Sequence, residues 1–108
     1  MELAEEIWDL VQEWDYFAKD TVGKQLVKAA DSISVNISEG FGRYSYKENK
    51  QFCYYSRGSL SETDTWLQKA TNRKLISQEA YTSFVKRLDK IGRKLNAYIK
   101  SIGPVPSD

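Results

Sequence analysis

The chain has 108 residues, of which 41% are hydrophobic and 29% are charged, and its formal net charge is +1. This size predicts one domain over residues 1–108 with a single core, and the composition excludes an intrinsically disordered protein. No apolar run approaches the ~20 residues that cross a bilayer, and the first residues are acidic where a signal peptide is basic. We therefore expect a cytoplasmic protein that does not contact membranes.

The predicted elements are amphipathic helices, four in number. The first covers about residues 2–17 and ends before residues 19–21, where the apolar spacing is interrupted. The second covers about residues 22–41 and ends where Gly40 and Gly42 allow the backbone to leave helical geometry.

The last two helices begin at serine caps. The third covers about residues 46–73, and Ser45 with Glu48 fits a capping box at its start. The fourth covers about residues 78–102 and follows Ser77, which is a typical N-cap residue.

The predicted fold class is all-α. The chain lacks the period-two alternation and the Asn-Gly or Asp-Gly turns of β-hairpins. Short connections force long neighbouring helices to lie antiparallel, which predicts an up-down-up-down four-helix bundle. In this topology the first helix borders the fourth. Residues 1–20 hold seven acidic groups and one lysine, so an acidic helix is expected beside a basic one.

A polar stripe runs beside the apolar face of the second helix and is expected to meet polar residues of the third. Burying an unpaired carboxylate costs several kcal/mol, so Glu39 and Glu62 should be paired, with Arg43 and Arg57 as candidate cations. The stripe could form a ligand or catalytic pocket, but a packing device that sets helix register and subunit contacts is favoured. The expected polar packing network consists of Gln25, Ser32, Asn36, Glu39, Arg43, Arg57, Ser59 and Glu62.

The residues in and around this stripe form an ordered pattern that covers most of the second and third helices. The pattern consists of Gln25-Leu26, Ala29, Ser32-Ile33, Asn36-Ile37, Glu39-Gly40, Gly42-Arg43, Phe52, Arg57-Gly58-Ser59 and Glu62. With this pattern the chain resembles a known family, the four-helix-bundle proteins named after intervening sequences in bacterial 23S ribosomal RNA genes. The resemblance implies a bundle that closes into a ring, typically a homopentamer, without known enzymatic activity. A related branch comprises the accessory proteins of diversity-generating retroelements, which are basic pentamers that bind a reverse transcriptase and RNA.

Apolar residues beside the core faces predict self-association, because several helices with a second apolar flank are typical of a protein interface. The alternative is a broad core with partial exposure. Cys53 is the only cysteine, so no intramolecular disulfide can form, and it is expected to be a small hydrophobe rather than a reactive thiol. The expected subunit interface comprises Trp8, Cys53, Leu60, Tyr81, Val85 and Ile99.

The residue inventory argues against an enzyme. The chain has no histidine, which removes Ser-His-Asp triads, Cys-His dyads, most zinc sites and the Glu-x-x-His pairs of di-iron bundles. A carboxylate pair acting on a sugar would need a cleft that compact bundles seldom offer. We therefore expect no catalytic residues, no metal and no cofactor.

Two groups of basic residues are candidate nucleic-acid sites. One lies on the fourth helix opposite its core residues, and the other lies near Tyr44, Tyr46 and Tyr54, whose rings could stack on unpaired bases. The alternative is a solvated helix face whose charge is neutralised by the acidic first helix. The candidates are Arg43, Lys47, Lys50, Lys86, Arg87, Lys90, Arg93, Lys94 and Lys100.

The function predicted from these patterns is a self-assembling oligomeric scaffold that is a candidate for association with RNA or a ribonucleoprotein such as a reverse transcriptase complex. The competing prediction is a protein-protein adaptor ring with no nucleic-acid role.

Overall fold

The computed structural model describes residues 1–103, so residues 104–108 of the predicted domain lie outside the described residues. Within this range all regular secondary structure is helical and no strand occurs, which confirms the all-α class with four main helices. The elements are α1 (Glu2–Gln12), α2 (Tyr16–Ala18), the π-helical segment η1 (Lys19–Gly23), α3 (Lys24–Phe41), α4 (Tyr46–Asn72) and α5 (Gln78–Ser101).

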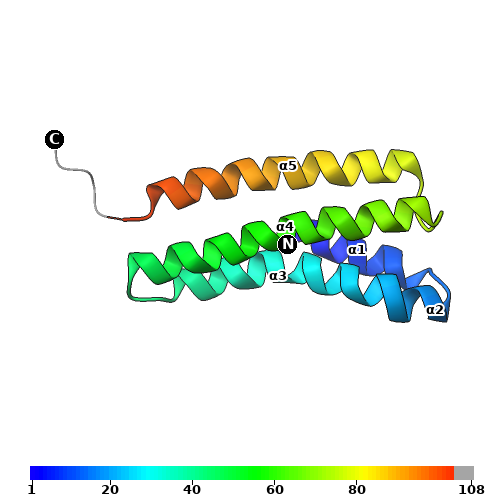
Figure 1. The fold of residues 1–108 in the computed structure, drawn as a ribbon, viewed down its shortest axis with the longest axis horizontal. Coiled ribbons are helices and arrows are strands. Elements are labelled where there is room, and N and C mark those ends of the chain that lie inside the picture. Colours follow the sequence, from blue (N-terminus) through cyan, green and yellow to red (C-terminus); the bar gives the residue numbers. More distant parts are fainter. Residues whose placement is uncertain (104–108) are drawn as a thin grey trace.

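The helices form a rod with principal extents of 55 × 23 × 18 Å. In Figure 1, α3, α4 and α5 lie along its long axis, and the chain reverses direction at residues 42–45 and 73–77. α1 packs against α3 over only part of this length, so the N-terminus lies near the middle of the rod. No described helix is both long enough and apolar enough to cross a membrane.

The predicted bounds of the first helix are wrong. α1 ends at Gln12, and a new helical turn begins after Asp15, whose side chain accepts a hydrogen bond from the Ala18 backbone N–H at 2.8 Å. The predicted break at residues 19–21 is absent, because η1 carries the helical chain directly into α3. Asp15 is a favoured N-cap residue that competes with continuation of α1, a local effect that apolar spacing does not report.

The remaining helix ends lie close to the predicted ones. Ser45 Oγ accepts a hydrogen bond from the Glu48 backbone N–H at 3.0 Å, and Ser77 Oγ accepts one from the Ala80 N–H at 3.0 Å. Both serines therefore cap their helices as expected.

The core is continuous along the rod and is closed most tightly between α3 and α4. Ser56 of α4 is fully buried, and its hydroxyl donates a 2.7 Å hydrogen bond to the Ile33 carbonyl oxygen of α3. Near the turn between these helices, Gly40 packs directly against the backbone of α4. The largest fully buried apolar side chains are Leu3, Ile7, Leu26, Ile33 and Leu67.

Replacing Gly40 tests this close contact. A Cβ atom at Gly40 would lie 2.9 Å from the Asn49 carbonyl oxygen and 2.9 Å from the Phe52 Cβ. Because backbone cannot yield as a flexible side chain does, we expect Gly40→Ala to lower the free energy of unfolding by ~1–3 kcal/mol. The matched control is Gly92→Ala in α5, where a Cβ would make an ordinary contact of 3.8 Å with the Leu60 side chain. This substitution should stabilise the helix by up to ~1 kcal/mol. Urea unfolding followed by circular dichroism measures both, and equal stability of the two variants would contradict the contact.

Candidate functional site

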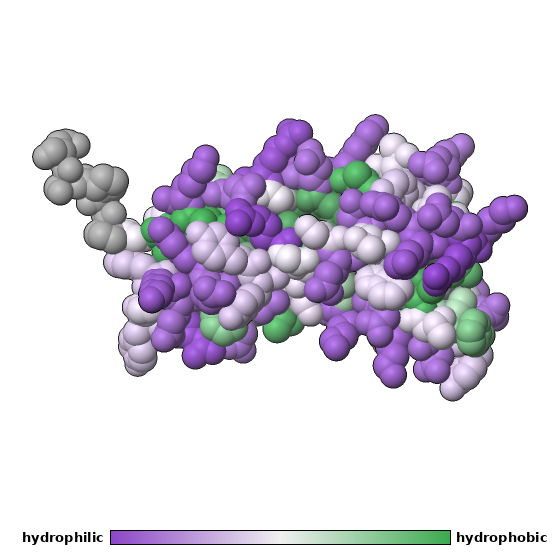
Figure 2. Space-filling view, in the orientation of Figure 1, coloured by the Kyte–Doolittle hydropathy of each residue, from purple (hydrophilic) through white to green (hydrophobic). Residues whose placement is uncertain are grey.

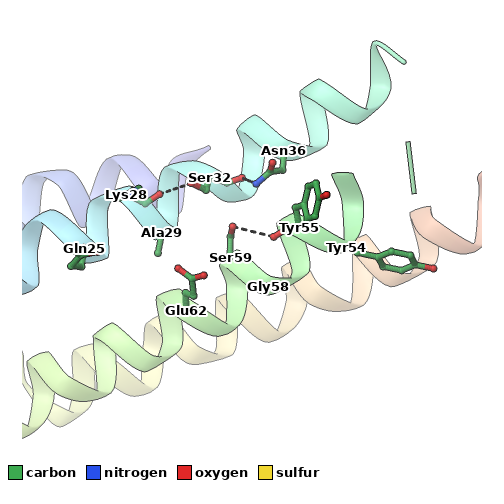
Figure 3. Close-up of a pocket in the computed structure, with 10 residues that line it drawn as sticks. All are labelled: Gln25, Lys28, Ala29, Ser32, Asn36, Tyr54, Tyr55, Gly58, Ser59 and Glu62. Atoms are coloured by element: carbon green, nitrogen blue, oxygen red, sulfur yellow. Dashed lines mark hydrogen bonds between the residues drawn. The ribbon is translucent and has the colours of Figure 1, made fainter. Parts of the chain in front are cut away.

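A groove of about 560 Å³ lies between α3 and α4 on the surface of the rod (Figure 3). It contains Gln25, Ser32, Asn36, Ser59 and Glu62, five members of the predicted polar packing network. The stripe therefore lies in an open groove rather than inside the bundle. The other lining residues are Lys28, Ala29, Tyr54, Tyr55 and Gly58.

The polar side chains of the groove form hydrogen bonds along their own helices. Ser32 Oγ donates to the Lys28 carbonyl oxygen at 2.8 Å, and Asn36 Nδ2 donates to the Ser32 carbonyl oxygen at 2.9 Å. On α4, Ser59 Oγ donates to the Tyr55 carbonyl oxygen at 3.2 Å. None of these bonds crosses from α3 to α4, so each helix satisfies its own side chains.

The predicted ion pairs form only in part. Arg43 lies 3.5 Å from the Glu39 carboxylate, as expected. Arg57 instead donates to Asn96 Oδ1 of α5 at 3.1 Å, and Glu62 is exposed and forms no ion pair with any residue of the 1–103 range. Five residues on a helix correspond to about 140°, so Arg57 and Glu62 lie on different sides of α4. The expected pairing of Glu62 with Arg57 is therefore not formed within the chain, where the Glu62 side chain is exposed.

The predicted interface residues are divided between core and surface. Cys53, Leu60 and Ile99 belong to the core, so the apolar flank expected there is already covered within one chain. Leu60 lies beside Gly92, which shows that α5 provides the cover. Burial raises the pKa of the Cys53 thiol, in agreement with its role as a small hydrophobe.

The other predicted interface residues retain some exposure. Tyr81 and Val85 are half-buried, and the Tyr81 hydroxyl donates to Asp64 Oδ1 at 2.9 Å. Trp8 is 50% exposed. Figure 2 shows hydrophilic side chains over most of the visible face, with smaller hydrophobic areas between them. Any interface on this face is therefore mixed in polarity.

Exposed aromatic side chains occur at both ends of the rod, and the sequence analysis does not include all of them among its candidate site residues. Tyr16 and Phe17 at one end are 80% and 77% exposed. Phe41 is 77% exposed and Tyr44 fully exposed at the other end, where α3 turns into α4 (Figure 1). For Tyr16 and Phe17, the sequence signal is Asp15, an N-cap residue that begins a new helical turn and so separates these two rings from the apolar face of α1.

Three of the nine candidate nucleic-acid residues are ion-paired. Arg43 pairs with Glu39 and Arg93 pairs with Asp89, both within one helix. Arg87 of α5 donates to the Glu6 carboxylate of α1. This last pair places the acidic first helix beside the basic last one, as the charge pattern predicts. The lysines Lys47, Lys86, Lys90, Lys94 and Lys100 are exposed, and Lys50 is half-buried.

Comparison with known proteins places this fold and groove in a family. Residues 1–97 match the family model described as 23S rRNA-intervening sequence protein. The chain belongs to this family. This chain also resembles a solved structure, which is described as a protein with unknown function from the S23 ribosomal protein family of Bacteroides thetaiotaomicron VPI-5482. The TM-score is 0.80 at 24% identity, and the match covers 92% of this chain and 93% of that one. No curated protein sequence matches the chain.

These comparisons confirm the predicted family, and the solved structure supports the fold alone. The predicted relation to retroelement accessory proteins stays a prediction. Across residues 1–103, no three His, Cys, Asp or Glu side chains group as a metal site requires. The groove offers hydrogen-bonding and charged side chains to a bound molecule.

The Glu6–Arg87 contact predicts a pH dependence of stability. The hydrogen bond from Arg87 lowers the pKa of the Glu6 carboxyl below its ordinary value. A lowered folded-state pKa stabilises the fold above the unfolded-state pKa of ~4.3, and this contribution is lost as the pH falls through the folded-state pKa. We expect Glu6→Gln to be less stable than the native chain at pH ~7, with the difference vanishing at pH ~2.

Urea unfolding at the two pH values measures this difference. Asp89→Asn is the control, because it breaks an exposed pair within α5 and should change stability little. The same deficit for Glu6→Gln at both pH values would argue against a charge-dependent contact between α1 and α5.

Proposed function

We propose that the protein is a non-enzymatic scaffold, an antiparallel up-down-up-down four-helix bundle whose copies close into a ring, a homopentamer, through the groove between α3 and α4. The observation that supports this proposal is the position of the polar stripe. The stripe lies open on the surface. Its side chains donate hydrogen bonds to carbonyl oxygens of their own helices, and these bonds leave other polar atoms of the same side chains unbonded within residues 1–103.

The register of α3 against α4 does not depend on this stripe. The bond from Ser56 to the Ile33 carbonyl and the close approach at Gly40 already set it. A stripe that served only register within one chain would bond across the two helices, and it does not. Its acceptor atoms, including Asn36 Oδ1, therefore favour recognition of a second molecule.

The shape and charge of the groove suit a second helical chain. Ala29 and Gly58 leave room for a backbone to approach closely. Lys28 on α3 and Glu62 on α4 provide charges of both signs, which a copy of the same chain can complement. Exposed Trp8 and the rings at the rod ends add aromatic contact area of the kind that interfaces favour.

Substitutions in the groove test self-assembly. Gly58→Ala adds a methyl group that the single chain accommodates, so we expect assembly to weaken while the helix itself becomes more stable. Glu62→Gln should weaken assembly as well, whereas the control Glu79→Gln on exposed α5 surface should not. Light scattering after size-exclusion chromatography at micromolar concentration measures the mass. A monomeric native chain would refute the scaffold, and unchanged assembly of both groove variants would favour a ligand pocket instead.

Association with single-stranded RNA is a second candidate function, favoured by the chemistry of the turn between α3 and α4. Tyr44 is fully exposed, and Tyr46 is 56% exposed beside the exposed Lys47. Arg57 lies 4.9 Å from the centre of the Tyr54 ring, on the same helix. Rings for base stacking and cations for phosphate thus share one end of the rod, and a ring of copies would repeat them.

RNA binding is tested with a fluorescent single-stranded oligonucleotide. We expect Tyr44→Ala with Tyr46→Ala, which lie outside the groove lining, to weaken binding by about tenfold or more, at a typical ~1–3 kcal/mol per stacked base, and binding to weaken as salt rises. Tyr16→Ala, which removes an exposed ring at the opposite end, is the control. Absence of binding, or affinity that ignores salt, would favour the adaptor ring without nucleic acid.

A further inference from the structure

One stripe of α5 is covered by α1 over only part of its length. Arg87, Ile91, Lys94 and Tyr98 recur at spacings of four, three and four residues and so share one side of the helix. Glu6 of α1 bonds Arg87. In Figure 1, α1 begins near the middle of the rod while α5 continues past it toward its C-terminal end.

A pocket of about 300 Å³ marks the place where the cover ends. Met1 and the α1 residues Glu2 and Leu3 line it from one side, and Arg87, Lys90, Ile91 and Lys94 line it from α5. Both lysines are exposed, and neither forms an ion pair with a described residue. The pocket thus combines apolar side chains with three cations and one carboxylate.

The covered part of the stripe shows what this chemistry recognises. α1 buries Leu3, Ile7 and Val11 at spacings of four residues. Its acidic edge faces α5, where Glu6 bonds Arg87 and the charge of Glu2 contributes to the raised pKa of that guanidinium. The acidic edge of α1 therefore already contacts this side of α5 within the chain, while the apolar face of α1 packs mainly on α3.

We propose that the uncovered part of the stripe docks a helix of a partner protein that is acidic along one edge and apolar on the adjoining face. Its apolar side chains contact the half-buried Ile91 and Tyr98, and its carboxylates face Lys90 and Lys94. The argument rests on continuity with the α1–α5 contact and on charge complementarity. It goes beyond the scaffold proposal, since none of these residues lines the groove between α3 and α4.

RNA fits this surface less well. The half-buried Ile91 and Tyr98 between the cations suit apolar side chains better than phosphate groups.

The test uses the full chain and a labelled peptide with the sequence of residues 1–14, which carries the proposed pattern of acids and apolar residues. We expect saturable binding by fluorescence anisotropy. The double variant Lys90→Glu, Lys94→Glu should weaken it about tenfold or more, equivalent to ~1.4 kcal/mol. The matched control is Lys86→Glu, Lys100→Glu, which makes the same charge change on the outer side of α5 and should leave binding intact. A peptide with all its acidic residues changed to amides should bind weakly.

Several outcomes would overturn the proposal. Equal binding by the two double variants would show that position on α5 is irrelevant. Faster proteolysis of α1 after peptide addition would show that the peptide replaces α1 instead of docking beyond it. Binding of a single-stranded RNA, but not of the peptide, through Lys90 and Lys94 would assign the surface to nucleic acid. A change in oligomer mass in the Lys90→Glu, Lys94→Glu variant would assign it to a second copy. Loss of assembly in the groove variants alone would leave peptide binding unchanged, so the two proposals fail separately.

Discussion

The close pairing of α3 and α4 is the constraint on which the rest of the structure depends. Gly40 allows the backbone of α3 to reach that of α4 near the turn, and a buried hydrogen bond from Ser56 to the Ile33 carbonyl joins the helices further along. A buried hydroxyl is tolerated only when it is bonded, so this bond also limits how α4 can slide along α3. The remaining helices pack against this pair.

The pairing of α3 and α4 explains why the polar stripe is not needed to hold these two helices together. Because register is set by contacts in the core, Gln25, Asn36 and Glu62 have no structural task within the chain and lie in an open groove. Their hydrogen-bonding groups are satisfied locally or by water, so the groove can be left empty at little cost and filled by a second molecule.

Because α1 is short, part of α5 is also left without a covering helix. Asp15 ends the reach of α1 by capping a separate turn, and η1 then turns the chain into α3 without a break. α1 begins near the middle of the rod and meets α5 between Arg87 and Lys94, so the stripe on α5 continues past α1 to Tyr98. The two surfaces for which we propose partners are therefore the polar groove between α3 and α4 and the cationic, partly apolar stripe along α5.

The sequence by itself determined the helical class, three of the four helix spans, the serine caps and the family, because these depend on periodicity and on residues close together in the chain. It also placed the acidic helix next to the basic one. Only the tertiary structure decided which flank of each helix is covered. Cys53, Leu60 and Ile99 lie in the core because α5 closes over α4, and Arg57 turns to Asn96 while Glu62 meets water. Such outcomes depend on which neighbour lies beyond a helix margin, and a periodicity of 3.6 residues carries no information about that neighbour.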